Sequence, residues 1–301
     1  MIASKAPRYE IERGHPHYPE GLHRVEQPPE RLYLRGACET LGIPGLAIVG
    51  ARKATPYGLN CARRFARLAA ARGIAVISGG AIGCDQAAHR GALEMGGKTV
   101  VVLGCGADVV YPQRGRELFE EVLATGGAIV AEAPWGAPPS RWGFRRRNRL
   151  IAGIARATLI VEAGLPSGTF STADATLAQG KEVLAVPGSI FAQESKGANH
   201  LILHGALPIV DDESFEDALS QVFGRSTVIG APASLGFTAG AQAQNGRQTK
   251  TLAALVQQPL RVEELLGICG DEVTEVVRYL SALELAGLVT RLRDGRYSAC
   301  A

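Results

Sequence analysis

Short apolar runs alternate with longer amphipathic stretches through the middle of the chain. The runs, rich in Val, Ile, Leu and Ala, lie at residues 46–50, 74–78, 99–104, 128–132, 157–162, 182–187 and 207–210. Most segments between them repeat apolar positions at helical spacing, as in "GLNCARRFARLAAARG". Continuous apolar strands separated by amphipathic helices are typical of a parallel sheet buried on both faces. The pattern predicts an α/β domain over residues 46–223.

The pattern changes on both sides of this domain. Residues 1–45 are polar and dotted with proline, so we expect an N-terminal extension that packs on the α/β core. Residues 224–248 are rich in Gly, Ala, Ser and Gln without periodicity, which is typical of a flexible linker.

A second unit is expected over residues 249–301. Helical segments at 250–257 and 261–267 are followed by a third helix that Asp271 would cap, and Asp294-Gly295 signals a hairpin. Three helices followed by a two-stranded wing predict a winged helix-turn-helix.

Charge in this second unit favours a protein partner over a DNA groove. Residues 250–301 carry six basic and seven acidic side chains, and the third helix opens with acids. Acids at that position would face phosphates unfavourably. The wing is basic through Arg291, Arg293 and Arg296, so a weak DNA contact and a transcription-factor role stay open as alternatives.

Composition narrows the class of protein. The 301 residues carry a net charge of only +3, so any surface for nucleic acid must be local. Six scattered cysteines without a C-x-x-C pair argue against a disulfide framework and a zinc site. No apolar run is long enough to span a membrane and no signal-peptide core is present, so we expect a cytoplasmic protein without a metal.

Three predicted strands run directly into small-residue loops that open helices. The loops lie at residues 49–58, 78–85 and 162–174. In a parallel sheet such loops share the carboxyl edge, and free N–H groups at a helix start attract anions. Together they predict a phosphate site.

Neither of the common nucleotide fingerprints is complete. The dinucleotide pattern G-x-G-x-x-G would place Ser78 where its first glycine belongs, and the near-Walker stretch "ALEMGGKT" has Ala92 at its first glycine. No cofactor is therefore expected.

A basic and aromatic cluster, "RWGFRRRNRL" at 141–150, has no acid within it. We expect its arginines to lie at or just before the N-terminus of a buried helix, where cations are unfavourable without an anionic ligand. Phe144 offers a face on which a base could stack, and Trp142 is as well suited to the core. Single-strand binders combine stacking faces with a basic track. The alternative is an ordinary solvated helix face.

The chain resembles the DNA-processing protein A family (DprA, also called Smf) over nearly its whole length. The resemblance rests on ordered motifs that include "IVGARKATPYG", "SGGAIGCDQAAHRGAL", "FRRRNRLIAGIA", "EAGLPSGTFSTA" and "KGANHLILHGA". It implies an extended Rossmann-like domain that binds single-stranded DNA and forms a homodimer. It also implies a role in natural transformation, protecting incoming DNA and helping to load the RecA recombinase.

The resemblance also assigns site residues. Arg52 and Arg141 would hold phosphates, Phe144 would meet a base, and Gly50 and Ala51 would offer backbone contacts. Ala51 stands where the family usually has serine. The complete expected DNA-binding set is Gly50, Ala51, Arg52, Ser78, Gly79, Gly80, Gly83, Arg141, Phe144, Arg145, Arg147, Asn148, Arg149, Ser167, Gly168 and Thr169.

An enzyme of the same broad fold is the alternative. The glycine loops are also similar to those of nucleoside-monophosphate phosphoribohydrolases, but Thr172 stands where their catalytic glutamate would be. A hydroxyl does not act as a carboxylate base near neutral pH. Asp85 with His89, Cys84 with a lowered pKa, Glu132 and Glu162 are the other candidates, and none forms a catalytic set by sequence. We expect no enzymatic activity.

Overall fold

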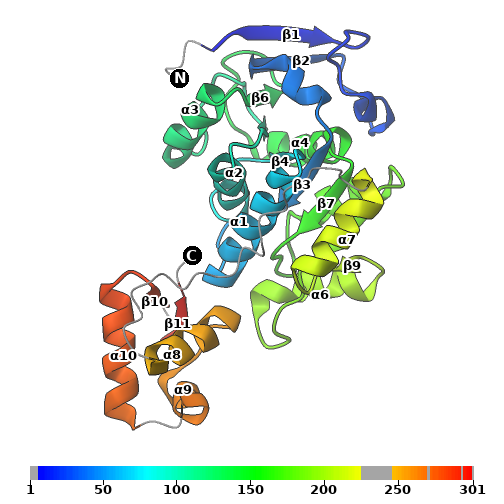
Figure 1. Cartoon of the computed structure of the whole chain (residues 1–301). Helices are drawn as coiled ribbons and strands as arrows, with labels where there is room; N and C mark the ends of the chain where they lie inside the picture. The colour runs from blue at the N-terminus through cyan, green and yellow to red at the C-terminus, as the bar shows by residue number, and fades with distance from the viewer. Residues whose placement is uncertain (1–5, 225–245, 270–271, 293, 300–301) are drawn as a thin grey trace. The chain divides into compact units, whose positions relative to one another are not determined.

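The computed structural model describes residues 6–224, 246–269, 272–292 and 294–299. Contacts divide these residues into a large unit that holds the main sheet and a small unit that holds the C-terminal helices (Figure 1). We call them the sheet domain and the winged-helix domain. The predicted linker falls mostly on residues 225–245, which lie outside the described residues.

The sheet domain is organised around one sheet, whose strands lie in the order β1-β2-β6-β5-β4-β3-β7-β8-β9. The strands are β1 (Arg8–Glu12), β2 (Arg31–Gly36), β3 (Gly45–Val49), β4 (Ala75–Ser78), β5 (Thr99–Leu103), β6 (Ala128–Ala131), β7 (Ala157–Ile160), β8 (Glu182–Ala185) and β9 (Leu207–Pro208). The seven predicted apolar runs correspond to β3 through β9, and the predicted α/β fold is confirmed.

The central strands are parallel, and their order reverses beside β3. From β3 the chain builds β4, β5 and β6 on one side, and then returns to place β7 against the other side of β3. In open α/β sheets, ligands bind outside the carboxyl ends of the strands at such a switch point. The topology thus points to the loops after β3 and β7.

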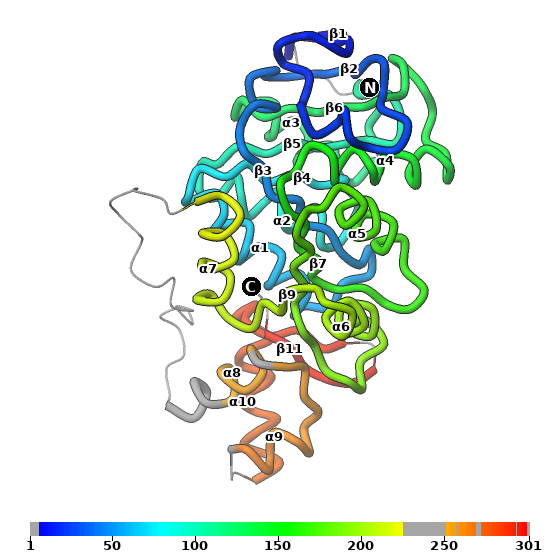
Figure 2. Tube along the Cα trace, turned by 90° about the vertical axis from the view of Figure 1, so that its right-hand side faces the viewer, coloured from blue at the N-terminus to red at the C-terminus, as the bar shows by residue number. Residues whose placement is uncertain are grey.

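Helices cover both faces of the sheet. They are α1 (Pro56–Ala71), α2 (Cys84–Glu94), α3 (Arg116–Ala124), α4 (Arg141–Ile154), α5 (Phe170–Leu177), α6 (Lys196–Leu203) and α7 (Asp212–Phe223), with 3-10 turns η1 (Glu20–Arg24), η2 (Cys38–Gly42), η3 (Gln113–Gly115) and η4 (Gln193–Ser195). Figure 2 shows α1 and α7 on one face and α4 and α5 on the other. Phe65 of α1 packs on Phe215 of α7, with 4.7 Å between ring centroids.

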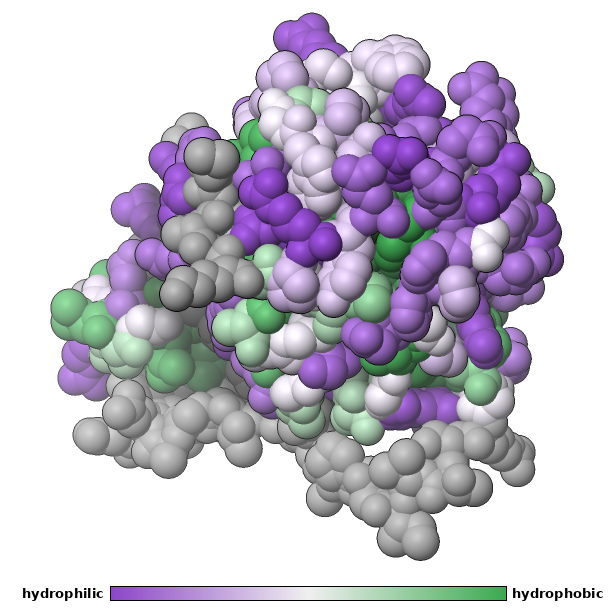
Figure 3. Space-filling model, turned by 90° about the horizontal axis from the view of Figure 1, so that it is seen from above, coloured by the Kyte–Doolittle hydropathy of each residue, from purple (hydrophilic) through white to green (hydrophobic). Residues whose placement is uncertain are grey.

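The N-terminal segment joins the sheet. β2 pairs antiparallel with β6, and β1 pairs antiparallel with β2 at the edge. Of the β1 residues only Ile11 is buried, and hydrophilic side chains cover most of the molecule's face in the view from above (Figure 3). Such a polar edge strand is expected at the end of an open sheet.

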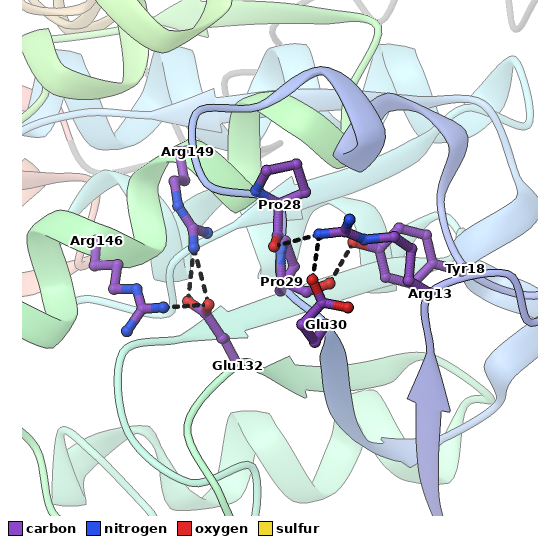
Figure 4. Close-up of polar contacts among 8 residues, drawn as sticks. All are labelled: Arg13, Tyr18, Pro28, Pro29, Glu30, Glu132, Arg146 and Arg149. Atoms are coloured by element: carbon purple, nitrogen blue, oxygen red, sulfur yellow. Dashed lines mark hydrogen bonds and ion pairs between the residues drawn. The ribbon is translucent and has the colours of Figure 1, made fainter.

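The segment between β1 and β2 is fixed by polar contacts. The Tyr18 hydroxyl donates to the Pro29 carbonyl at 2.7 Å, and Arg13 donates to the Pro28 carbonyl at 2.8 Å (Figure 4). Arg13 also pairs with Glu30 at 2.8 Å. These bonds close the segment into a loop that packs beside α4, through contacts between η1 and α4.

The winged-helix domain has the predicted order of elements. Its helices are α8 (Gly246–Gln257), α9 (Val262–Cys269) and α10 (Val273–Leu285), and its wing is β10 (Val289–Arg291) paired with β11 (Tyr297–Ala299). The expected cap Asp271 lies outside the described residues, and Glu272 at the N-cap position of α10 makes no side-chain capping bond. Gly295 has φ +86° in the hairpin turn, which explains why glycine follows Asp294 there.

None of the helices in the described ranges combines the length and apolar content that crossing a bilayer requires.

Candidate functional site

A cavity of about 870 Å³ opens at the carboxyl edge of the sheet, at the switch point between β3 and β7. The loop after β3, the first three turns of α4 and the loop before α5 form its walls, with Tyr111 at its rim. Most of the predicted site residues line it, namely Gly50, Ala51, Arg52, Arg141, Phe144, Arg145, Arg147, Asn148, Ser167, Gly168 and Thr169. Two of the three predicted loops therefore meet as expected.

The third loop, residues 78–83, supports the cavity from behind. Ser78 is buried and donates to the Ile48 carbonyl at 2.6 Å. A Cβ on Gly79 would lie 2.2 Å from Nη1 of Arg147, and a Cβ on Gly83 would lie 2.3 Å from the Ala51 carbonyl oxygen. Gly80 packs against Phe119 in the same way. These residues line no part of the cavity, and only Ala81 of this loop reaches it.

Helix α4 begins earlier than the sequence pattern indicated. Ser140 caps it by accepting the Gly143 N–H at 3.0 Å, so the arginines lie along its first turns and not before them. Positions 141, 145 and 148 follow the helical repeat and share one face. This face presents Arg141, Arg145 and Asn148 to the cavity.

The basic cluster has no acid within its own stretch, but it has an acidic partner from another strand end. Glu132, which follows β6, accepts from Arg146 at 2.6 Å and from Arg149 at 2.9 Å on both carboxylate oxygens (Figure 4). The Arg149 side chain is only 11% exposed. Arg149 therefore lies outside the cavity, as one half of a paired structural charge, whereas Arg141, Arg145 and Arg52 are exposed.

Arg147 is buried under the cavity and shares its surroundings with Asp85. Its guanidinium donates to the Val102 carbonyl, and the Asp85 carboxylate accepts the Gly79 and Ala81 N–H groups at 3.2 and 3.3 Å. Burial lowers the pKa of Arg147 to about 10, so it stays charged at neutral pH. Burial raises the pKa of Asp85 and the charge of Arg147 opposes that shift. The two charges compensate each other beneath the site and hold the 78–83 loop.

The aromatic residues of the cluster divide into two kinds. Trp142 is 67% exposed, so it is not a core residue, and Arg146 lies over its ring at 4.9 Å. Phe144 is half-buried, packs on Tyr111 with 5.2 Å between centroids, and has the Arg52 guanidinium 5.6 Å from its ring. A flat ring beside an exposed guanidinium is what stacking of a base next to a phosphate requires.

The loop before α5 is held in place by its own hydroxyls. Ser167 Oγ donates to Thr169 Oγ1 at 2.9 Å and accepts the Thr169 N–H at 3.2 Å. Asn148 Nδ2 donates to the Gly168 carbonyl at 3.3 Å and to Ser171 Oγ at 2.7 Å, which ties the loop to α4. The Asn148 amide, which was expected to bind DNA, therefore holds the loop that forms one wall of the cavity.

Two of the candidate catalytic residues, Cys84 and His89, are buried in the protein core. Burial raises the pKa of the Cys84 thiol well above its ordinary value, so Cys84 is not the low-pKa thiol that its place at a helix start could have produced. His89 contacts Thr99 Oγ1 through Nδ1 at 2.6 Å, and that hydroxyl donates to the Val76 carbonyl at 2.6 Å. Nδ1 must then carry the proton, and among the described residues Nε2 has no partner. His89 is a buried neutral group without a catalytic contact.

We predict that His89 makes the fold acid-sensitive. Burial lowers the pKa of His89 from an ordinary 6.5 to about 3. Below pH 6.5 the histidine therefore takes up a proton in the unfolded chain, whereas in the folded chain it does so only near pH 3. Stability from this residue is complete above pH 6.5 and falls by about 2 kcal/mol by pH 5. Denaturant unfolding of wild type and His89→Asn at pH 7 and pH 5 should show their stability difference shrinking by that amount. Parallel pH profiles would contradict this assignment.

The sequence of this chain matches that of a known protein family. The sequence profile of the DNA recombination-mediator protein A family matches residues 10–222, and that of the DprA winged helix domain matches residues 238–295. Protein Smf of Escherichia coli is 35% identical over 278 residues, which cover 92% of this chain and 74% of that protein.

Two solved structures are similar to most of this chain. DNA processing protein A from Streptococcus pneumoniae superposes with a TM-score of 0.64 at 31% identity, over 71% of this chain and 74% of that one. DNA processing protein A from Helicobacter pylori, studied for its single-stranded DNA binding mode, superposes with a TM-score of 0.65 at 29% identity, over 72% of this chain and 97% of that one.

Proposed function

Because the chain belongs to the DNA recombination-mediator protein A family, we propose that its sheet domain binds single-stranded DNA in the cavity at the β3–β7 switch point. The observation that carries the proposal is the lining of that cavity, where exposed Arg52, Arg141 and Arg145 surround the half-buried ring of Phe144. The arginines neutralise phosphates and the ring stacks on a base. Gly50 and Ala51 also line the cavity, and the backbone at Gly168 is open to close approach because a Cβ there would meet no protein atom within 4 Å.

A strand leaving the cavity has a basic path along α4. A second groove of about 520 Å³ shares Trp142 and Arg145 with the cavity and is lined also by Arg24, Arg146 and Arg149. Glu26 and Asp174 lie in it as well and offset part of this positive charge. We propose that this groove extends the DNA site and binds the strand weakly, with the exposed Trp142 ring as a second face on which a base can stack.

The finer biological role is part of the same proposal. The resemblance supports a function in natural transformation, in which the protein acts in the cytoplasm, protects single strands and helps to load the RecA recombinase. It also supports a homodimer through the sheet domain. Exposed apolar side chains at the β9 end of the sheet, on Leu203, Leu207 and Val210, are suited to such a contact.

Hydrolysis of a nucleotide is the alternative for this cavity. The side chain at the place of the catalytic glutamate is Thr172, which is buried and lines the cavity. A threonine hydroxyl cannot replace a carboxylate as a base. We therefore propose that the cavity binds DNA and does not hydrolyse nucleotides.

A truncation tests which domain binds. A chain that ends at Phe223, the last residue of α7, should keep most of its affinity for a labelled oligothymidine, measured by fluorescence anisotropy. Its fold can be checked first by circular dichroism. Loss of binding by a folded truncation would place the DNA site in the winged-helix domain and overturn the proposal.

A further inference from the structure

A cluster of metal-ligand side chains lies away from the cavity, at the N-terminal end of the sheet domain. His17, from the segment between β1 and η1, meets Cys38 and Glu39, which begin η2. One imidazole nitrogen, the thiol sulfur and one carboxylate oxygen all lie within 4.8 Å of one another. We propose that these three side chains bind a zinc-class divalent cation.

The chemistry of the three donors selects the metal. Imidazole, thiolate and carboxylate are together the ligands of zinc, whereas calcium and magnesium take oxygen donors. In a tetrahedral site with bonds of about 2.0–2.3 Å, donor atoms are roughly 3.5 Å apart. The side chains need to close only slightly to hold an ion, and Glu39 is exposed and His17 half-buried, so both have room to move.

The fourth position falls to water. The nearby His15 has its ring centroid 5.5 Å from that of His17, but its Nδ1 accepts the His17 N–H at 3.1 Å. An accepting Nδ1 leaves the proton of a neutral ring on Nε2, so neither nitrogen is free to bind a cation. His15 is therefore a neighbour of the site and serves as its control.

Binding exchanges a proton for the metal. The Cys38 thiol loses its proton to solvent as the sulfur–metal bond forms, while His17 and Glu39 coordinate through lone pairs they already have. No oxidation is involved. The bound ion would join the loop that carries His17 to η2, across about twenty residues of chain, and so stabilise the N-terminal segment beside α4.

The site escapes sequence reasoning because its ligands come from two separate segments. The six cysteines include no C-x-x-C pair, and that spacing indicated no zinc site. Only the folding of the segment between β1 and β2 brings His17 next to Cys38.

Cobalt and zinc titrations of the full, tag-free chain test the proposal. Wild type should bind one Co²⁺ with a thiolate-to-cobalt charge-transfer band, and Zn²⁺ should displace it and raise the Tm. Cys38→Ser should lose the band, and His17→Ala should weaken binding by at least the roughly 10–100-fold that loss of a residue supporting a ligand causes. His15→Ala and Cys61→Ser, a cysteine in α1, should bind as wild type does.

Other results would overturn it. A wild type without the band, a band that survives in Cys38→Ser, or loss of binding in His15→Ala would each contradict this ligand set. If Cys38→Ser fails to fold, His17→Ala decides, because a half-buried histidine can be replaced with little effect on the core. Wild-type affinity in a folded His17→Ala would then reject the site.

Discussion

Replacing Arg147 with methionine is expected to destabilise the sheet domain by about 3–5 kcal/mol, because it leaves the buried Asp85 carboxylate without its compensating charge. Asp85 is only 6% exposed and its hydrogen bonds to Gly79 and Ala81 come from the loop behind the cavity. For a domain of this size the loss corresponds to a fall in Tm of roughly 6–20 °C.

The pH dependence separates charge from packing in this variant. Without Arg147, the pKa of Asp85 should rise further above its ordinary value, so the folded variant takes up a proton more readily than the unfolded chain does. The destabilisation should then be larger at pH 8 than at pH 5, since acid neutralises the stranded carboxylate. An equal loss at both pH values would mean that the variant suffers from packing alone.

Tryptophan fluorescence follows this unfolding in the intact chain. Both tryptophans, Trp135 and Trp142, belong to the sheet domain, so their signal reports that domain alone. Arg146→Met is the matched control, because Arg146 is 37% exposed and its pair with Glu132 should contribute at most about 1 kcal/mol. If Arg147→Met is no less stable than Arg146→Met, the buried charge of Arg147 is not what supports the site.

Arg52→Ala and Phe144→Ala should both weaken single-strand binding, but in different ways. Arg52→Ala removes a phosphate contact, so the log–log salt slope should become shallower by about 0.7 and all sequences should be affected alike. Phe144→Ala removes a stacking face, so binding should weaken by about 1–3 kcal/mol while the slope stays nearly unchanged.

Matched variants guard this comparison. Lys53 is exposed, follows Arg52 directly and does not line the cavity, so Lys53→Ala should have a much smaller effect than Arg52→Ala. Phe144→Leu keeps apolar volume against Tyr111 but offers no flat face, so it should bind as poorly as Phe144→Ala. Wild-type affinity in both Arg52→Ala and Phe144→Ala would place the DNA elsewhere.

The sequence predicted the strands well because each is a continuous apolar run. Buried parallel strands need such runs, and β3 through β9 follow them. β1 and β2 went unpredicted as strands because the segment around them is polar and rich in proline. β2 pairs with β6, which lies about a hundred residues away in the sequence, and local periodicity does not reveal such a distant partner.

The sequence predicted two loops that line the cavity, but it did not predict where α4 begins or which charges pair beside it. The loops at 50–52 and 167–169 follow from strand ends that share one sheet edge, and both line the cavity. The start of α4 was missed because "RWGFRRRN" has no apolar repeat, although Ser140 is a capping residue. Glu132 lies at the end of another strand, so its pairing with Arg146 and Arg149 could be found only in three dimensions.

The 78–83 loop shows the limit of a glycine signal. Its glycines resemble those of an anion site, yet their missing side chains make room for protein atoms, namely Arg147 at Gly79 and the Ala51 carbonyl at Gly83. Sequence spacing cannot separate a glycine that admits a ligand from one that admits a neighbouring chain segment.

Single-strand binding by the full chain is tested by fluorescence anisotropy of a labelled oligothymidine, compared with the same strand in duplex form, over several salt concentrations. We predict a strong preference for the single strand and an affinity that falls steeply as salt rises, because phosphates and unstacked bases are bound together. Binding that favours the duplex, or no binding at low salt, would contradict it.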